Sequence, residues 1–393
     1  MAVTDYSSLF EPLRLGKVTL RNRFAMPAMQ IGYTRDCAPT PQMVAHLRDR
    51  ARGGLGLMFS ESCAPDHPSA YWQQGFAAIN PRTRPAWAEV VEAVKGEGAA
   101  FLMQLWHPGA MRTPVKGFVH ADTPTLSPSG LAQAGRANGQ AMSAAELDDI
   151  AAAFVRAAQD AKAIGADGVE LHAAHGYLFD QFLWSETNQR GDRFGGEALE
   201  DRARYPLAIA AEIRAACGPD FVISIRFSQF KEVDYGAKVF ATPDELGRFI
   251  ALAEAAGLTM LNVSSRRFTK PEWPELDPRL NIAGWAKKLG RLPVMTIGSV
   301  GLSSDIFADL FDKEDPSLQI GADLAELASR RAAGEFDIAG IGRMLIANPE
   351  LVAKVAAGEV DKLQLFSKSV HLKHLLGSME PGLVEEERKV AEV

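Results

Sequence analysis

Eight short apolar segments, separated by segments of helix length, constrain the fold more than any other feature of this sequence. Their residues are apolar without strict alternation, which is typical of parallel strands buried on both faces. We expect strands at Phe24–Gln30, Leu55–Ser60, Phe101–Leu105, Gly168–Leu171, Phe221–Phe227, Thr259–Val263, Pro293–Ile297 and Phe336–Ile341.

The segments between these strands predict helices with recognisable ends. Thr40 and Thr242 are expected N-caps, and Ser143 with Glu146 forms the pattern of a capping box. The expected helices are Pro41–Arg52, Arg84–Gly96, Ser143–Ile164, Ala198–Cys217, Pro243–Ala256, Leu324–Ala333 and Pro349–Ala357. Eight strand–helix units in one chain predict a (β/α)8 TIM barrel. The alternative α/β fold is an open doubly wound sheet, but no G-x-G-x-x-G motif follows the first strand.

The predicted barrel divides the chain into three parts. Residues 1–23 form a lead-in, residues 24–357 a single barrel domain, and residues 358–393 an extension. Residues 108–142 are rich in Gly, Pro, Ser and Thr, and predict a long loop after the third strand. Long structureless loops in compact domains are usually functional, for example as lids.

The amino-acid composition limits the kinds of molecule that this protein is expected to bind. Hydrophobic residues make up 47% and charged residues 23% of the chain, which is typical of a globular protein with a large core. The net charge of −7 argues against nucleic acid or an anionic membrane as a partner. Three widely spaced cysteines form neither a disulfide framework nor a metal motif, and no export signal or membrane-length apolar run is visible. We therefore expect a cytoplasmic protein that acts on a small molecule.

The segment Gly168–Gly196 carries the strongest signal for chemistry. His172, His175 and Tyr177 lie within six positions at the end of the fourth strand, the end at which barrels place their active sites. Two imidazoles and a phenol can hold and protonate a carbonyl-bearing substrate. Two alternatives stay open: the histidines are metal ligands together with Glu170 or His107, or they are core residues with satisfied hydrogen bonds.

Glycines after the last two strands indicate a phosphate site. Gly298 and Ser299 follow the seventh strand, and Gly342 and Arg343 follow the eighth. TIM barrels commonly bind phosphate at these two loops through backbone N–H groups. A glycine in one of these loops alone can be explained as a residue that forms the turn. Glycines in both loops together favour binding of a phosphorylated cofactor or substrate.

Two polar residues interrupt apolar strands. Gln104 lies near the end of the third strand, and Arg226 lies within the fifth. A buried arginine is costly unless it meets an anion or several acceptors. The N1–C2=O2 edge of a flavin provides such acceptors, whereas the alternative is an internal ion pair with a carboxylate such as Glu170.

The motifs of this chain, taken together, resemble those of one family. Gly168–Gly196 contains H-x-x-H-G-Y-L, Q-F-L, N-x-R and D-R-F-G-G. Arg21–Met29 reads R-N-R-F-A-M-P-A-M, and Gly342–Pro349 reads G-R-x-L-I-A-N-P. In order and spacing these resemble the Old Yellow Enzyme family of FMN-dependent ene-reductases.

The resemblance implies bound FMN, with NADPH or NADH as reductant, and assigns residues to it. One loop would line the flavin, Ser62 and Gln104 would contact its pyrimidine ring, and Arg226 would lie near N1. The lining residues are Pro27, Ala28, Met29 and Gln30, and the phosphate-binding residues are Gly298, Ser299, Gly342 and Arg343. Gln30 stands where relatives usually have Thr or Cys.

The resemblance also implies a reaction. His172 and His175 would grip the oxygen of an α,β-unsaturated carbonyl or nitro compound. FMN N5, reduced by NAD(P)H in a ping-pong cycle, would deliver hydride to the β-carbon, and Tyr177 would protonate the α-carbon. Trp106 and Trp184 would shape the substrate pocket, although Trp184 replaces the usual Ser or Asn.

Three other functions remain open from the sequence. The first is a related FMN dehydrogenase or demethylase acting on amines or saturated ketones, because the same chemistry runs in both directions. The second is a metal-dependent barrel hydrolase that uses His172 and His175. The third is a flavin-binding protein without turnover.

Overall fold

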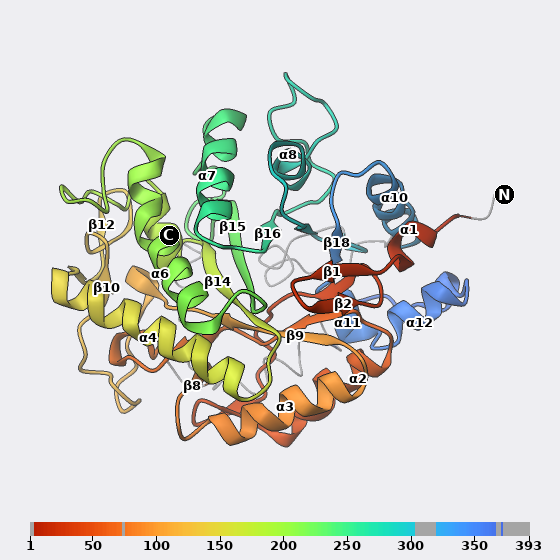
Figure 1. The fold of residues 1–393 in the computed structure, drawn as a ribbon, viewed down its shortest axis with the longest axis horizontal. Helices are drawn as coiled ribbons and strands as arrows, with labels where there is room; N and C mark the ends of the chain where they lie inside the picture. The colour runs from red at the N-terminus through yellow and green to blue at the C-terminus, as the bar shows by residue number, and fades with distance from the viewer. Residues whose placement is uncertain (1–3, 73–74, 303–319, 367–370, 372–393) are drawn as a thin grey trace.

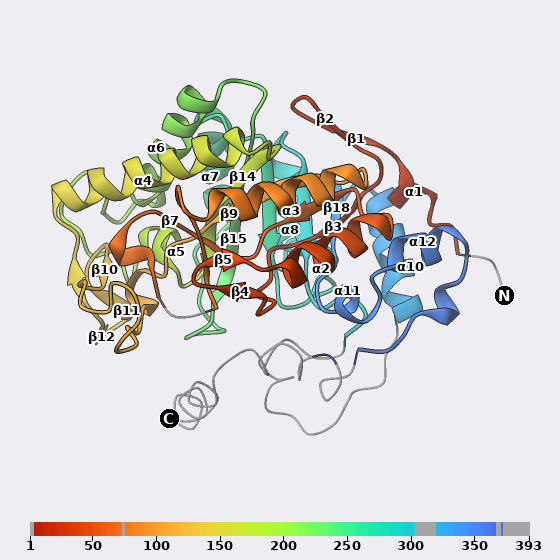
Figure 2. The same ribbon diagram turned by 90° about the horizontal axis from the view of Figure 1, so that it is seen from below.

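Eight parallel strands close into a barrel surrounded by helices (Figures 1 and 2), which confirms the predicted fold and excludes the open sheet. The computed structural model describes residues 4–72, 75–302, 320–366 and 371. The barrel strands, in order of pairing, are β3 (Phe24–Met26), β6 (Leu57–Phe59), β9 (Ala100–Leu105), β14 (Gly168–His175), β15 (Val222–Lys231), β16 (Met260–Ser264), β17 (Val294–Ile297) and β18 (Ile338–Gly340). The pairing of β18 with β3 closes the ring.

The helices pack around the barrel and include all those predicted. The longer ones are α2 (Pro41–Arg52), α3 (Arg84–Gly96), α4 (Ala144–Ala163), α6 (Leu199–Cys217), α7 (Pro243–Ala255), α8 (Ile282–Leu289) and α10 (Ile320–Ala332). The short ones are α1 (Ser7–Phe10), α5 (Leu178–Leu183), α11 (Met344–Ala347) and α12 (Leu351–Ala356), with 3-10 turns η1 (Pro68–Ala70), η2 (Gly109–Met111) and η3 (Val360–Lys362). Four of these α-helices, α1, α5, α8 and α11, were not predicted. None of the described helices is long and apolar enough to cross a membrane.

All three residues predicted as N-caps stand at that position, and two of them make a side-chain hydrogen bond to the helix. Ser143 Oγ accepts the backbone N–H of Glu146 at 3.3 Å, and the Glu146 carboxylate accepts the Ser143 N–H at 2.7 Å. Thr242 Oγ1 accepts the backbone N–H of Glu245 at 3.3 Å and so caps α7. Thr40 stands at the N-cap of α2, but its hydroxyl donates to the carbonyl of Tyr33 at 2.7 Å and makes no hydrogen bond to the helix.

The lead-in forms a hairpin that covers the N-terminal end of the barrel. Its strands are β1 (Leu13–Leu15) and β2 (Val18–Leu20), paired antiparallel. Leu15 and Leu20 pack with apolar side chains that point into the barrel, including Leu57, Leu102 and Val222. This end of the barrel is therefore a packed core.

The loop after β9 is more ordered than expected. The predicted long loop contains two small ladders, and its role as a lid stays a prediction. The short strands are β10 (Leu126–Ser127), β11 (Leu131–Gln133), β12 (Arg136–Ala137) and β13 (Gln140–Ala141). The loops after β3 and β6 add β4 (Thr34–Arg35), β5 (Ala38–Pro39), β7 (Cys63–Pro65) and β8 (Ala77–Ile79).

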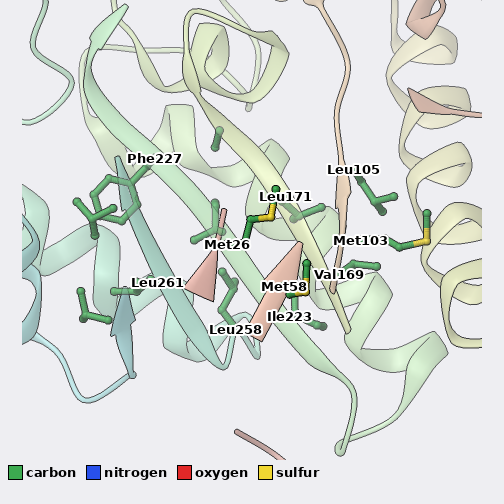
Figure 3. Close-up of a cluster of buried hydrophobic side chains, with 14 of the residues drawn as sticks. Met26, Met58, Met103, Leu105, Val169, Leu171, Ile223, Phe227, Leu258 and Leu261 are labelled. Carbon is green, nitrogen blue, oxygen red and sulfur yellow. The ribbon is translucent and has the colours of Figure 1, made fainter. Parts of the chain in front are cut away.

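Each barrel strand has two buried faces of different character. The outward face packs under the helices (Figure 3) and is apolar, as Met58, Met103, Leu171 and Phe227 illustrate. The inward face is apolar next to the hairpin and becomes polar toward the C-terminal ends of the strands. The division into residues 1–23, 24–357 and 358–393 stays a prediction, because much of the last part, like most of residues 303–322, lies outside the described residues.

Gly168 allows β14 and β15 to approach closely, which gives a test of the barrel packing. A Cβ on Gly168 would lie 2.2 Å from the backbone oxygen of Val222. We expect Gly168→Ala to lower the free energy of unfolding by about 1–3 kcal/mol in urea denaturation. The matched control is Gly191→Ala, where an added Cβ meets no atom of the described structure within 4 Å. Equal stability of the two variants would contradict the packing argument.

Candidate active site

The register of the barrel strands places polar side chains next to one another at the C-terminal end of the barrel. Glu170 pairs with Gln104 on one neighbouring strand and with Ser224 on the other. One step further along, His172 pairs with Arg226, and Arg226 pairs with Asn262. Because side chains alternate along a strand, all of these point into the barrel.

A buried hydrogen-bond network around Glu170 forms the floor of the site. The Glu170 carboxylate accepts from Gln104 Nε2 at 2.9 Å, Ser224 Oγ at 2.9 Å and Asn262 Nδ2 at 2.8 Å. Ser62 Oγ donates to Gln104 Oε1 at 2.8 Å, which brings two predicted flavin contacts together. Burial raises the pKa of Glu170, and the charge of Arg226 and these hydrogen bonds oppose the rise.

Arg226 lies above this floor, 8% exposed, with its guanidinium only partly satisfied. Nη1 donates to the carbonyl oxygen of Ala28 at 3.2 Å, and Nη2 donates to Ser264 Oγ at 3.2 Å. Nε finds no acceptor among the described residues. No ion pair joins Arg226 to Glu170 within the described part of the chain, although the charge of Glu170 partly offsets the lowering of the Arg226 pKa by burial.

His172, His175 and Tyr177 form one cluster. The His172 ring centroid lies 5.2 Å from that of His175 and 5.2 Å from that of Tyr177, edge to face in both cases. Burial lowers the pKa of both histidines well below 6.5, and the positive charge of Arg226 lowers it further. Both imidazoles are therefore neutral at pH 7, and each has one ring N–H to donate.

The hydrogen bonds of the histidines indicate which nitrogen carries the proton. His172 Nδ1 accepts the backbone N–H of Ala174 at 3.4 Å, which leaves the proton of the neutral ring on Nε2. His175 Nε2 lies 2.9 Å from Ser264 Oγ. Because Ser264 accepts from Arg226, its own hydroxyl proton can be donated to His175 Nε2, so that His175 keeps its proton on Nδ1.

A left-handed turn carries the chain from β14 into α5. His175 has φ of 66°, which is uncommon for a residue with a side chain, and Gly176 follows with φ of 93°. The His175 N–H donates to Ser228 Oγ at 3.0 Å, and this bond fixes the turn against β15. The turn directs Tyr177 back over the end of the barrel.

Aromatic rings enclose Tyr177 on one side. Its ring lies edge-on to Trp106, with centroids 5.3 Å apart. Trp106 stacks on Phe76 at 4.9 Å and on Trp72 at 5.8 Å, and its Nε1 has no acceptor among the described residues. Trp72, Phe76, Trp106 and Tyr177 form the aromatic wall of the site.

A fully buried ion pair lies behind the turn. Lys231 Nζ is 2.8 Å from Asp180 Oδ1, and both side chains are 0% exposed. Asp180 Oδ2 also accepts the Gly176 N–H at 2.6 Å, which ties α5 to the turn. The Lys231 ammonium lies 5.7 Å from the ring centroid of Trp184. Trp184 therefore packs against this ion pair, and the pocket-shaping role expected for it stays a prediction.

The two loops predicted to bind phosphate are neighbours, because Ile297 pairs with Gly340. A Cβ on Gly298 would lie 2.5 Å from the backbone nitrogen of Phe268, so that only glycine fits there. Ser299, with φ of 49°, donates its hydroxyl to the carbonyl of Arg266 at 2.7 Å.

The second of these loops meets the loop after β3. A Cβ on Gly342 would lie 3.0 Å from Met29 Sδ, so that the predicted flavin and phosphate residues are adjacent. The Arg343 guanidinium lies 5.9 Å from the ring centroid of Phe366. In the loop after β3, Pro27 follows β3 directly, and the Gln30 side-chain amide donates to the carbonyl of Gly75.

The residues proposed as further metal ligands have other partners. His107 Nδ1 accepts the Gly109 N–H at 3.0 Å, and its Nε2 lies 2.9 Å from Ser69 Oγ. Glu170 is held by three donors in the floor. Among the residues that the structure describes, no group of three or more His, Cys, Asp or Glu side chains is arranged to hold a metal ion.

Comparison with known proteins places the chain in a family. Residues 8–299 match the model of the NADH:flavin oxidoreductase / NADH oxidase family. The chain belongs to this family. This confirms the resemblance to the Old Yellow Enzyme family.

Similar proteins include longer ones. A NADH oxidase of Thermoanaerobacter brockii is 31% identical over 373 residues, 92% of this chain and 52% of that protein. A metal reductase of Desulforamulus reducens is 30% identical over 366 residues, 91% of this chain and 50% of that protein. The chain spans about half the length of these two relatives. The structure of Old Yellow Enzyme from Pichia sp. AKU4542 aligns with a TM-score of 0.73 at 25% identity, over 92% of this chain and 89% of that one.

The described residues fit FMN. Two buried donors, Arg226 Nε and Trp106 Nε1, have no acceptor among the described residues, and a flavin ring is rich in acceptors. Arg226 also contacts the backbone of Ala28, in the loop that the resemblance assigns to the flavin. When FMN is bound, Ser62, Gln104 and Arg226 would hold the pyrimidine side, and the loops at Gly298 and Gly342 would hold the phosphate.

The buried ion pair of Lys231 and Asp180 should matter more for the free energy of unfolding than an exposed ion pair does. We expect Lys231→Met to lower the free energy of unfolding by about 3–5 kcal/mol, because it leaves Asp180 buried without its partner. The control is Arg52→Met, which breaks an ion pair with Glu97 at an Arg52 side chain that is 59% exposed, and should cost much less stability, because solvent screens an exposed ion pair. Chemical denaturation of both variants measures the difference, and similar losses would contradict it.

The neutral histidines make stability depend on pH. A base whose pKa is lower in the folded state binds fewer protons there than in the unfolded chain, so that stability falls as the pH drops below about 6.5. Each such histidine contributes a slope of up to about 1.4 kcal/mol per pH unit. In urea denaturation, His172→Asn should make this slope shallower, while His107, whose pKa is lowered for the same reason, keeps its contribution. An unchanged slope would contradict a neutral buried His172.

Proposed function

We propose that this protein reduces the activated C=C bond of α,β-unsaturated carbonyl or nitro compounds. The observation that carries the proposal is the cluster of neutral His172 and His175 with Tyr177 at the C-terminal end of the barrel. FMN supplies the hydride chemistry when bound, with NADPH or NADH as the reductant. The chain's own residues then have to bind, orient and protonate the acceptor.

The histidines suit the binding of a neutral, polarised oxygen. His172 Nε2–H and His175 Nδ1–H are the two donors that their other contacts leave available. A carbonyl or nitro oxygen accepts both, and gains negative charge as the β-carbon is reduced. Arg226, which lies close to both histidines, adds positive potential to this region.

Tyr177 suits the protonation step. A phenol keeps its proton at neutral pH and can give it to a carbanion centre. The aromatic wall of Trp72, Phe76, Trp106 and Tyr177 supports the proposal, because flat apolar surfaces orient a conjugated acceptor and exclude water.

Separate measurement of the two half-reactions tests the proposal. In Tyr177→Phe, flavin reduction by NAD(P)H should keep its rate, because no proton from Tyr177 is needed there. Reoxidation of the flavin by 2-cyclohexenone should slow by about 10²–10⁴-fold, the usual contribution of a general acid. Anaerobic stopped-flow absorbance at the flavin band follows both steps.

The outcomes separate the candidate functions. Unchanged reoxidation in Tyr177→Phe would remove Tyr177 as the proton donor. A wild-type protein that NAD(P)H reduces, but that no enone or nitroalkene reoxidises, would move the proposal to the dehydrogenase or demethylase alternative.

A further inference from the structure

Glu232 is a rim residue that the proposed reaction does not yet use. It directly follows β15, and its carboxylate accepts the Tyr177 hydroxyl at 3.1 Å. Its backbone N–H donates to the carbonyl of His175 at 3.1 Å, so that the carboxylate is held beside the turn that carries Tyr177. The contact therefore joins two strands that both extend past the rest of the barrel.

The surroundings keep both partners in place. Asp180 and Lys231 fix the turn from behind, and Lys231 is the residue next to Glu232. Trp106 and His172 pack edge-on against the Tyr177 ring, which restricts its rotation. The Tyr177 hydroxyl thus has a defined position beside the Glu232 carboxylate.

We propose that Glu232 is a positioning residue that controls the proton of Tyr177 during reduction of the acceptor. This inference rests on the proposed function. In its ionised form, Glu232 accepts the phenol proton and directs it away from the substrate. In its protonated form, Glu232 donates to the phenol oxygen, and the phenol proton turns toward the substrate.

The proton balance of this step is simple. The O–H bond of Tyr177 breaks as the C–H bond at the substrate α-carbon forms. The carboxyl proton of Glu232 passes to the phenolate oxygen and restores the phenol. Glu232 is left ionised and takes its next proton from water, so that one solvent proton is consumed per turnover.

Other charged groups face this pair and shape its pH dependence. Arg226 lies near enough for the charges of Glu232 and Tyr177 to stabilise its cation. His172 and His175 lie beside the phenol but are neutral, and Lys231 is paired with Asp180. Asp234 is on the same segment as Glu232 and is exposed. Among the described residues, the Glu232 carboxylate accepts a hydrogen bond from the Tyr177 hydroxyl.

The first test is the pH profile of flavin reoxidation by 2-cyclohexenone. In the wild type, the rate constant should fall by about tenfold per pH unit above the ionisation of Glu232, because the protonated form is the active one. Glu232→Gln, which cannot ionise, should lose this limb of the profile, and Glu232→Asp should restore it. Asp234→Asn is the control, since it removes a nearby negative charge without touching Tyr177. A wild-type profile in Glu232→Gln would overturn the proposal.

The second test does not require turnover. The ionisation of Tyr177 is followed by ultraviolet absorbance, as the difference between each protein and its Tyr177→Phe counterpart. Without the neighbouring carboxylate, the phenol in Glu232→Gln should ionise at a pH lower by about one unit. An unchanged titration would overturn the coupling of the two groups. If the titration shifts but no enone reoxidises the wild-type flavin, the coupling stands and the proposed function fails.

Discussion

Side chains along each strand of the closed barrel alternate between its outside and its inside, and the rest of this structure depends on this two-residue period. In each strand it directs one row of side chains under the helices and the other into the barrel. The inner row is apolar where the N-terminal hairpin covers it and polar at the opposite end. A one-residue slip of β14 against β15 would turn Glu170 and His172 away from Gln104 and Arg226, and would remove the floor of the site.

The second level of organisation lies where β14 and β15 extend beyond the barrel. His175 pairs with Lys231 after an irregularity in the ladder, and the left-handed turn follows at once. The buried pair of Lys231 and Asp180 anchors this turn, although it touches neither histidine nor the phenol in any hydrogen bond of the described residues. The position of Tyr177 thus depends on an ion pair packed behind the turn.

The sequence predicted the barrel because strand and helix periods are local properties. It also singled out Gln104 and Arg226, since polar residues in apolar strands require buried partners. Their actual partners were not predictable: Arg226 contacts Ala28 and Ser264, which are far away in the chain. Thr40 illustrates the same limit. Its hydroxyl donates to the carbonyl of Tyr33, and a capping pattern in the sequence cannot reveal such a contact.

The residues that sequence reasoning missed are those whose role comes from tertiary contacts. Glu232 reads as an exposed acid at a strand end, and Trp72 and Phe76 read as loop aromatics; only the fold brings them to Tyr177 and Trp106. Asp180 and Lys231 are only weakly indicated by the sequence. Asp180 is a charged residue directly before the Q-F-L motif, and Lys231 is a lysine at the end of a mostly apolar strand. Pairing them required knowledge of the turn between β14 and α5.

We propose that this barrel holds a flavin whose electrons pass to an electron-poor alkene. The most direct measurement is the anaerobic visible spectrum of the protein reconstituted with FMN, recorded before and after one equivalent of NADPH or NADH and again after 2-cyclohexenone. We expect a flavin band that bleaches with the nicotinamide and returns with the enone. A protein that binds no FMN, or whose bleached band stays bleached in excess enone, would contradict it.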